Sequence, residues 1–272
     1  MALYVPKNEY VIPQDQRNTI SLRYKTVTKA INSSLWGISS DTSHSFYVGS
    51  YGRGTAIDTS DIDVLVEVPQ SFYVQNPFTT YNPQSRLLQV VKNAILKSYP
   101  RSDVRGDGQV VVIDFSDDIK FEVLPAIQQT DPWGRKTYKY PDSHMGGRWM
   151  STNPEEEQNA MEAKNATSNG LLFDTCKHMR YIRDNYYSSY HLSGIVIDAF
   201  VYAAMAEWRW TPPGGGAGAP KGDYESVLLK YFNDKSWYGQ FDFTLSAPGS
   251  GDSVSTSGSL NCLGKVLTKM TE

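Results

Sequence analysis

The feature that most constrains the fold of this chain is a pair of aspartates at the start of an apolar run. Asp61 and Asp63 flank Ile62, and residues 62–68 are mostly apolar before Pro69. Residues two apart on a strand point to the same face, so a strand here would place both carboxylates together. Neighbouring carboxylates resist ionisation, which favours a cation beside them. The alternative is two solvated acids at the end of a strand.

A Gly-Ser turn precedes these aspartates. Gly49 and Ser50 open the segment 49–55, and Ser50 lies eleven residues before Asp61. Glycine allows close approach of the backbone, and the serine hydroxyl with nearby N–H groups can hold a phosphate. Gly-Ser alone is a common turn. Combined with two acids at this spacing, it predicts a phosphate-binding turn beside a site for Mg²⁺ (or Mn²⁺), a hard cation that prefers oxygen ligands.

A third acid is expected from a neighbouring strand. Glu122 lies within the apolar stretch 119–124, where an unpaired charge is costly. Asp114, which follows another apolar run, is the rival, and an outward-facing Glu122 on an edge strand is the structural alternative. We expect Asp61, Asp63 and Glu122 to be catalytic residues and to bind two metal ions. Next to a phosphate-binding turn, such a site indicates phosphoryl transfer, with the third acid able to accept a hydroxyl proton.

Hydrophobic periodicity predicts the helices and strands of an α+β fold. Helices are expected at residues 17–36, 83–99, 171–187, 193–210, 225–232 and 260–270 and from residue 154, and strands at residues 44–48, 62–68, 109–115, 119–124 and 241–245. Turn-like residues 116–118 predict a hairpin, and Pro125 is expected to end its second strand.

The remaining segments are expected to be loops, at residues 130–153, 211–222 and 247–259. The predicted domains are a catalytic lobe of residues 1–126 and a mainly helical, nucleotide-binding lobe of residues 127–272.

Composition narrows the class of protein. With 40% hydrophobic and 20% charged residues, the 272-residue chain can build a packed core. The net charge of −3 gives no global basic field, so no obligatory nucleic-acid partner is implied. No apolar stretch approaches the roughly 20 residues of a transmembrane helix, and the two cysteines, Cys176 and Cys262, imply no disulfide framework. We therefore expect a soluble cytoplasmic protein without a membrane partner.

The motif residues resemble those of the DNA polymerase β-like nucleotidyltransferase superfamily, in which Gly-Gly or Gly-Ser is followed by Asp-apolar-Asp/Glu and a later acid in a strand. Residues 49–57 (Gly-Ser-Tyr-Gly-Arg-Gly-Thr-Ala-Ile), 60–63 (Ser-Asp-Ile-Asp) and 121–126 (Phe-Glu-Val-Leu-Pro-Ala) are similar to its bacterial cGAS/DncV-like branch, the CD-NTases. Residues 152–154, Asn165 and the predicted helices near 171–185 and 193–205 fit the same branch. Two positions depart from it: Glu122 stands where many members have Asp, and Asp198 where Glu is common.

This resemblance implies a polymerase β-like catalytic lobe, with a mixed sheet and flanking helices, and a mainly helical second lobe. It also implies an enzyme of anti-phage, CBASS-type signalling. Such an enzyme joins nucleoside triphosphates, ATP among them, into a cyclic di- or trinucleotide second messenger and releases pyrophosphate. A downstream effector would bind the product, and a regulatory protein partner is a further expectation.

Two alternatives to this activity stay open. One is a nucleotidyltransferase that makes a linear oligonucleotide or modifies a protein, RNA or small-molecule hydroxyl. The other is an inactive nucleotide-binding scaffold.

Further nucleotide-binding residues are expected outside the Gly-Ser turn. Lys177 and Arg180 lie three apart on a predicted helix and share a face. In the resembling family a basic residue on this helix contacts the triphosphate, and Arg180 is preferred here with Lys177 second. A solvated basic face is the alternative. Arg53 could touch phosphate or support its loop, and Tyr181 could stack on a base or pack in the core.

Overall fold

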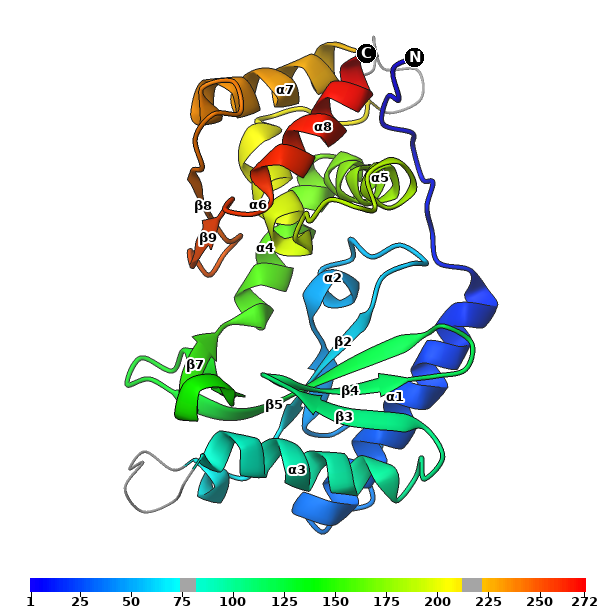
Figure 1. The fold of residues 1–272 in the computed structure, drawn as a ribbon, viewed down its shortest axis with the longest axis vertical. Helices are drawn as coiled ribbons and strands as arrows, with labels where there is room; N and C mark the ends of the chain where they lie inside the picture. Colours follow the sequence, from blue (N-terminus) through cyan, green and yellow to red (C-terminus); the bar gives the residue numbers. More distant parts are fainter. Residues whose placement is uncertain (74–81, 212–221) are drawn as a thin grey trace. The chain divides into compact units, whose positions relative to one another are not determined.

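The computed structural model of the chain describes residues 1–73, 82–211 and 222–272 (Figure 1). The chain divides into two compact units. Residues 13–52 and 61–153 form the sheet unit, and residues 1–12, 53–60 and 154–272 form the helical unit. The segment 53–60 therefore belongs to the helical unit, although the residues before and after it belong to the sheet unit.

A mixed sheet is the centre of the sheet unit. The described residues form seven strands, with β1, β2, β5, β4 and β3 side by side in that order and β6 and β7 added through β5. β2 and β5 run parallel, and the other pairs are antiparallel. The strands are β1 (Ser45–Tyr47), β2 (Ile62–Glu67), β3 (Asp103–Asp107), β4 (Val110–Asp114), β5 (Lys120–Thr130), β6 (Lys136–Asp142) and β7 (Arg148–Thr152).

Helices cover one face of this sheet. α1 (Gln14–Leu35) and α3 (Pro83–Leu96) pack on each other and on the strands. Asn82 caps α3 by accepting a hydrogen bond from the Ser85 N–H, and Pro83 suits the first helical turn. The sheet unit also contains the one-turn helix α2 (Gly49–Gly52) and two short 3₁₀ helices, η1 (Gln70–Phe72) and η2 (His144–Gly146).

Alternation along β2 and β5 separates the core from the candidate acids. Val64, Phe121 and Val123 are fully buried, whereas Asp63 and Glu122 are only partly buried. Successive side chains of a strand point to opposite faces, so the two acids lie on the face opposite to Val64, Phe121 and Val123.

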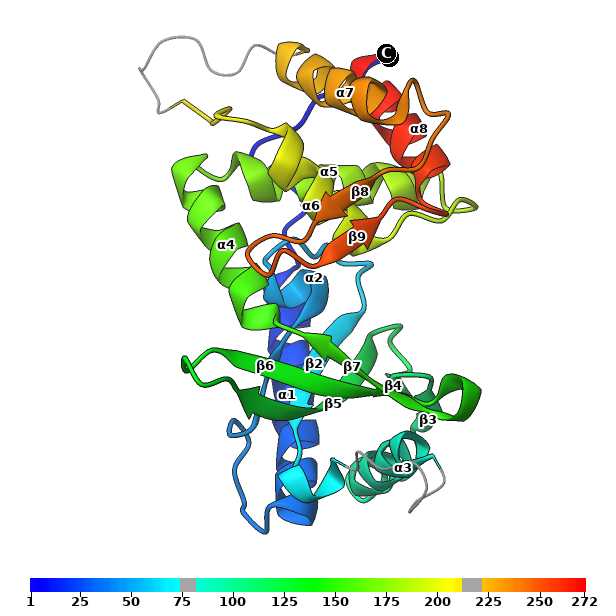
Figure 2. The same ribbon diagram turned by 90° about the vertical axis from the view of Figure 1, so that its left-hand side faces the viewer.

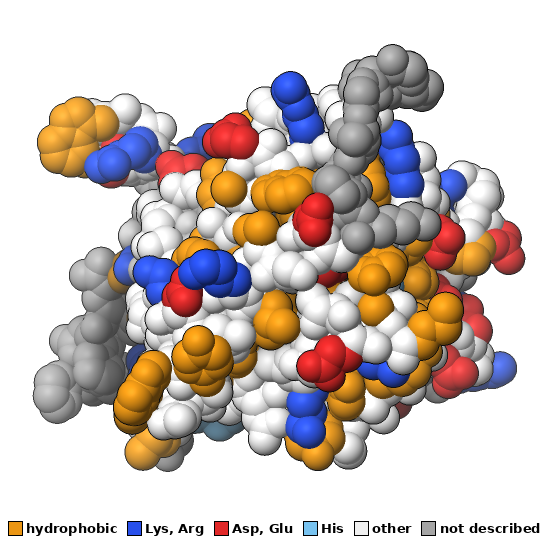
Figure 3. Space-filling model, turned by 90° about the horizontal axis from the view of Figure 1, so that it is seen from above, with side chains coloured by type: hydrophobic (Ala, Val, Ile, Leu, Met, Phe, Trp, Pro, Cys, Tyr) orange, Lys and Arg blue, Asp and Glu red, His pale blue; other side chains and the backbone are white. Residues whose placement is uncertain are grey.

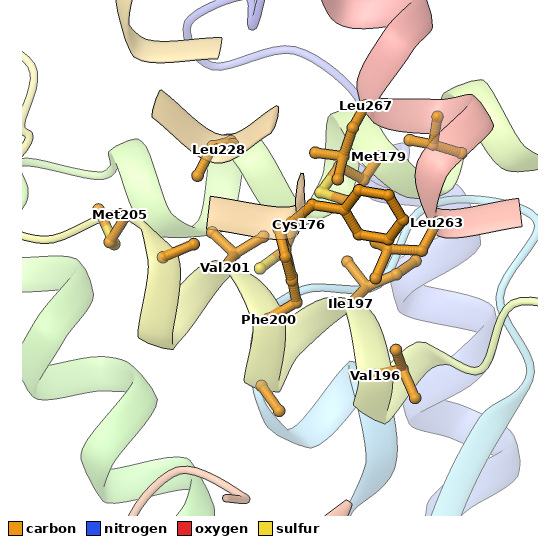
Figure 4. Close-up of a cluster of buried hydrophobic side chains, with 14 of the residues drawn as sticks. Cys176, Met179, Val196, Ile197, Phe200, Val201, Met205, Leu228, Leu263 and Leu267 are labelled. Carbon is orange, nitrogen blue, oxygen red and sulfur yellow. The ribbon is translucent and has the colours of Figure 1, made fainter. Parts of the chain in front are cut away.

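The helical unit is built around a large apolar core. Its elements are α4 (Pro154–Thr167), α5 (Leu171–Tyr186), α6 (Gly194–Ala204), α7 (Asp223–Ser236), α8 (Leu260–Thr271) and the two-stranded sheet β8 (Thr244–Ser246) and β9 (Ser253–Ser255). Figure 4 shows the core, to which α5, α6, α7 and α8 contribute Met179, Phe200, Leu228 and Leu263. No helix in the described ranges combines the length and apolarity that a membrane crossing requires.

Most predicted elements are present, with shifted ends. The predicted hairpin is confirmed, because β4 and β5 pair antiparallel. The prediction that Pro125 ends a strand is wrong: β5 continues to Thr130, and its last four residues pair with β6 (Figure 2). Residues 130–153 are therefore not a loop, because β6 and β7 form a second antiparallel pair there. Within 211–222, residues 212–221 lie outside the described residues.

Three further differences from the predicted elements and boundaries have structural causes. The helix expected at 193–210 ends at Ala204, and Ala206 has a left-handed backbone (φ 46°) that a helix cannot continue. β3 was not expected, because Val104 is its only buried residue and the strand lacks an apolar pattern. The unit boundary after Asn153 also differs from the expected boundary after residue 126, since β5 runs through that position without a break.

Leu87→Ala should lower the free energy of unfolding by about 2–5 kcal/mol. Leu87 on α3 is 1% exposed, so its truncation leaves a cavity in the core of the sheet unit. Leu22→Ala on α1 removes the same atoms from a side chain that is 68% exposed, and it should change stability by less than about 0.5 kcal/mol. Urea unfolding of both variants measures the difference, and equal losses would contradict the described core.

Candidate active site

The parallel pairing of β2 and β5 brings two of the expected acids together. Asp63 and Glu122 are direct partners in the register of these strands. Asp61 lies one residue before β2, two residues from Asp63, and thus on the same side of the strand. The three acids expected from the sequence therefore lie at one end of a single strand pair in the sheet unit.

A lysine lies among these acids. The Nζ atom of Lys120 is 2.6 Å from Oε1 of Glu122 and donates a hydrogen bond to Oδ2 of Asp61 at 3.1 Å. Partial burial opposes the charged form, but the hydrogen bonds to Glu122 and Asp61 hold the pKa of Lys120 above its ordinary value. Lys120 thus partly neutralises the acidic cluster that we define as Asp61, Asp63 and Glu122.

The donor atoms of the acidic cluster fit a hard divalent cation. Three carboxylates supply only oxygen ligands, which Mg²⁺ and Mn²⁺ prefer, and the register places Asp63 beside Glu122. Within the described residues no group of three or more His, Cys, Asp or Glu side chains is arranged so that it could hold a metal ion. The Lys120 ammonium lies between two carboxylates of the cluster.

Asp114, the rival third acid, has other partners. It is opposite Lys120 in the β4–β5 register, but its Oδ2 is paired with the guanidinium of Arg105 on β3. The same guanidinium also contacts Asp103 at 2.9 Å. The geometry therefore favours Glu122 over Asp114 as the acid that joins Asp61 and Asp63.

Gly49 is required by the close approach of Asp63. The backbone N–H of Val48 donates to the Asp63 carbonyl at 2.9 Å, which brings the turn against the start of β2. Gly49 has a φ of +58°, and a Cβ there would overlap the Asp63 carboxylate. Ser50 follows in the one-turn helix α2. The Gly-Ser turn and the acidic cluster are therefore parts of one local structure.

The helical unit holds a buried charge network. Asp198 on α6 is fully buried and accepts hydrogen bonds from Arg180 at 2.7 and 2.9 Å. Its Oδ2 also accepts from Nε of Arg53 at 2.9 Å and from the Thr55 hydroxyl at 3.1 Å. Arg53 reaches further to Glu157 on α4 at 3.0 Å. Burial would raise the pKa of Asp198, but Arg180 and Arg53 hold it below its ordinary value.

This network involves both arginines that were expected to bind nucleotide. The Arg180 side chain is 1% exposed and that of Arg53 is 8% exposed. Arg180 also donates to the backbone carbonyls of Gly194 and Cys176. Both guanidiniums are thus engaged with buried acceptors, and the structure shows them holding the segment 53–60 and the helices of the helical unit.

Lys177 and Tyr181 lie on the same helix, α5, and are partly exposed. The Tyr181 ring stacks on Tyr10 with centroids 4.4 Å apart, so one of its faces is already covered. Tyr10 also stacks on His178, which hydrogen-bonds to the Leu3 carbonyl and ties the N-terminal segment to α5.

Lys120 is the residue that the sequence analysis missed. The motif Lys-Phe-Glu at 120–122 contains the signal, because residues two apart on a strand share a face. The role of Asp198 as a buried counter-ion had no such signal, since Arg53 is 145 residues away in sequence.

The chain matches the family model of the Second Messenger Oligonucleotide or Dinucleotide Synthetase domain, SMODS, over residues 7–165. No curated protein sequence matches it.

Solved structures with similar folds include several nucleotide cyclases and synthases. The CdnE cyclic dinucleotide synthase of Elizabethkingia meningoseptica, with GTP and Apcpp, is 14% identical with a TM-score of 0.62, covering 93% of this chain and 89% of that one. A mutant of the Vibrio cholerae dinucleotide cyclase DncV is 12% identical with a TM-score of 0.63, and the match covers 99% of this chain and 91% of that one. CdnC of E. coli MS115-1, in complex with HORMA-deltaN, is 12% identical with a TM-score of 0.59, covering 94% and 84%.

The fold is therefore that of the cGAS/DncV-like nucleotidyltransferases. Because the SMODS model covers more than half of the chain, the chain belongs to the SMODS family and is a nucleotidyltransferase. The predicted branch, the α+β fold with a polymerase β-like lobe and the enzyme class are confirmed.

Gly49→Ala should destabilise the turn more than the backbone conformation alone explains. Both Gly49 and Gly37 have a positive φ, at +58° and +68°, but a Cβ at Gly37 meets open space. Gly37→Ala should therefore cost only about 1–2 kcal/mol for the left-handed backbone. Gly49→Ala should cost about 1–3 kcal/mol more, because its methyl group displaces the Asp63 carboxylate. Denaturant unfolding compares them, and equal costs would disprove the close approach.

Asp198→Asn should lower the free energy of unfolding by about 3–5 kcal/mol, because it removes the counter-ion of the buried Arg180 guanidinium and leaves Arg53 with Glu157 alone. The matched control is Asp234→Asn, which breaks an exposed pair with Lys230 on α7 and should cost about 0.3–0.5 kcal/mol. A small loss for Asp198→Asn would show that the network is not buried as described.

The pH dependence of unfolding gives a second measurement. Because the pKa of Asp198 is depressed in the folded state, its stabilising contribution is present above the unfolded-state pKa of about 3.9. It is lost as the pH falls below that value. Asp198→Asn should therefore make the fall in stability below about pH 4 shallower, whereas Asp234→Asn should leave it nearly unchanged.

Proposed function

We propose that this protein joins nucleoside triphosphates into a cyclic di- or trinucleotide second messenger and releases pyrophosphate, in anti-phage signalling. The observation that carries the proposal is the β2–β5 register, which pairs Asp63 with Glu122 and brings Asp61 beside them, against the Gly-Ser turn. Membership of a family of oligonucleotide and dinucleotide synthetases supports the product class.

The acidic cluster would hold two Mg²⁺ (or Mn²⁺) ions. Such ions, when bound, lower the pKa of an attacking hydroxyl and neutralise charge on the triphosphate. Glu122 would accept the hydroxyl proton. The hydroxyl oxygen of one nucleotide then bonds to the α-phosphorus of the next. The bond from that phosphorus to the bridging oxygen breaks, and pyrophosphate leaves.

The remaining residues would bind and orient the nucleotides. Gly49 and Ser50 would form the turn for the triphosphate, and Lys177, which is partly exposed on α5, would contact phosphate. Tyr181 would stack on a base, in addition to its stack on Tyr10. Arg53 and Arg180 would act indirectly, by holding the segment that follows the turn through Asp198.

The partners follow from the same activity. Nucleoside triphosphates are the substrates, and an effector protein would bind the product. The E. coli CdnC structure contains HORMA-deltaN, which supports a regulatory protein partner for this chain as well. On the face in Figure 3, the described acidic and basic side chains are interspersed. No obligatory nucleic-acid partner is proposed. The cytoplasm is the proposed compartment, and no membrane partner is proposed.

Incubation with labelled ATP, GTP, CTP and UTP and Mg²⁺ or Mn²⁺ should give a product that resists phosphatase. Asp63→Asn and Glu122→Gln should lower its yield by about 100-fold or more, because each removes a carboxylate that would hold the metal ions, and those ions neutralise the negative charge of the transition state. Mass spectrometry identifies the product.

Asp114→Asn is the matched control for this activity. Asp114 is on the neighbouring strand but is paired with Arg105, so product formation should continue. A phosphatase-sensitive product would indicate linear oligonucleotides instead of a ring. Undiminished product from Asp63→Asn, or none from the wild type with any nucleotide, would contradict the proposal.

A further inference from the structure

Lys120 is held by the carboxylates that the proposed metal ions would need. Its Nζ bridges Glu122 at 2.6 Å and Asp61 at 3.1 Å. A divalent ion such as Mg²⁺ binds carboxylate oxygens at about 2.0–2.1 Å. The ammonium and the ion would therefore compete for the same oxygens, and their positive charges would repel each other at this separation.

Lys120 and its two carboxylates are more exposed to solvent than a permanent ion pair in the same chain. The Asp198–Arg180 pair has side-chain exposures of 0% and 1%, and a planar guanidinium makes two hydrogen bonds to the carboxylate. The Lys120 side chain is 31% exposed and those of Glu122 and Asp61 are 27% and 47% exposed. Lysine is a single charge on a flexible four-carbon stem, so its ammonium can move from the cluster into solvent.

We propose that Lys120 is a displaceable counter-ion, which takes the place of a divalent cation in the metal-free acidic cluster and must leave before that cation binds. The inference rests on the metal site of the proposed function. Lys120 keeps Asp61 and Glu122 close together when no metal is present. It also raises the metal concentration that the site needs, because only the fraction of molecules with the lysine displaced can bind the ion.

Removing the ammonium should therefore tighten metal binding. Binding of Mn²⁺ to the full-length protein can be measured by electron paramagnetic resonance of the free ion, without nucleotide. Lys120→Gln should lower the dissociation constant about tenfold, the change expected if the ammonium leaves the cluster about a tenth of the time. Lys25→Gln is the matched control, since it removes the same charge from an exposed position on α1, and it should bind Mn²⁺ as the wild type does.

A second measurement follows the lysine itself. Acetylation of lysines in the wild type, read by mass spectrometry, should be slow at Lys120 in EDTA and several-fold faster in saturating Mn²⁺, with Lys25 unchanged. If Lys120 only weakened metal binding through its field, Lys120→Gln would bind Mn²⁺ more tightly but the acetylation of Lys120 would not respond to the ion. That result would overturn the proposal, as would equal Mn²⁺ affinities of the two lysine variants.

Asp63→Asn separates this inference from the proposed function. If Asp63→Asn removes Mn²⁺ binding and Lys120→Gln does not change it, the metal site stands and the displacement by Lys120 is wrong. If Asp63→Asn does not change the binding of Mn²⁺, the metal site of the proposed function fails, and this inference fails with it.

Discussion

The parallel pairing of β2 with β5 is the constraint on which the candidate active site depends. Asp63 and Glu122 come from segments far apart in sequence and meet only because these two strands align residue for residue. A slip of one residue would turn every side chain of one strand to the opposite face. It would put a carboxylate where Phe121 and Val123 are now fully buried. The apolar core therefore fixes the register, and the register assembles the acids.

Assembling three carboxylates creates an electrostatic problem, which the chain meets with a cation. The repulsion among Asp61, Asp63 and Glu122 must be offset in the folded protein. Lys120 does so in part, from a position two residues before Glu122 on the same strand. In the helical unit the opposite case occurs: the single carboxylate of Asp198 is matched by two guanidiniums and is buried. The acidic cluster is partly exposed, so one cation can replace another there, as proposed for Lys120. The buried network does not allow such an exchange.

Motifs and apolar patterns in the sequence predicted the features that depend on residues close together in the chain. The Gly-Ser turn, the Asp-Ile-Asp motif and Glu122 identified the acids, and alternating apolar residues identified β2, β4 and β5. Predictions were wrong where long-range pairing overrides a local rule. A proline usually interrupts a strand. Here Pro125 lies opposite Val66 in the ladder, and pairing with β6 extends the strand beyond it. Arg53 was expected to touch phosphate or to support its loop, and only the fold reveals its partner on α6.

The family model matches the part of the chain that holds the candidate active site, but not the later helices that we expect to select the nucleotide. Residues 7–165 include the Gly-Ser turn, the acidic cluster and Lys120, so the candidate active site lies within the part of the chain that the family model matches. α5, α6, α7 and α8 lie beyond residue 165, and with them Lys177 and Tyr181. Phosphoryl transfer places the same demands on charge whatever the base, whereas recognition of a base depends on side chains that stack on it or contact its edge. Differences in product among such enzymes are therefore expected to arise mainly from the helices after residue 165.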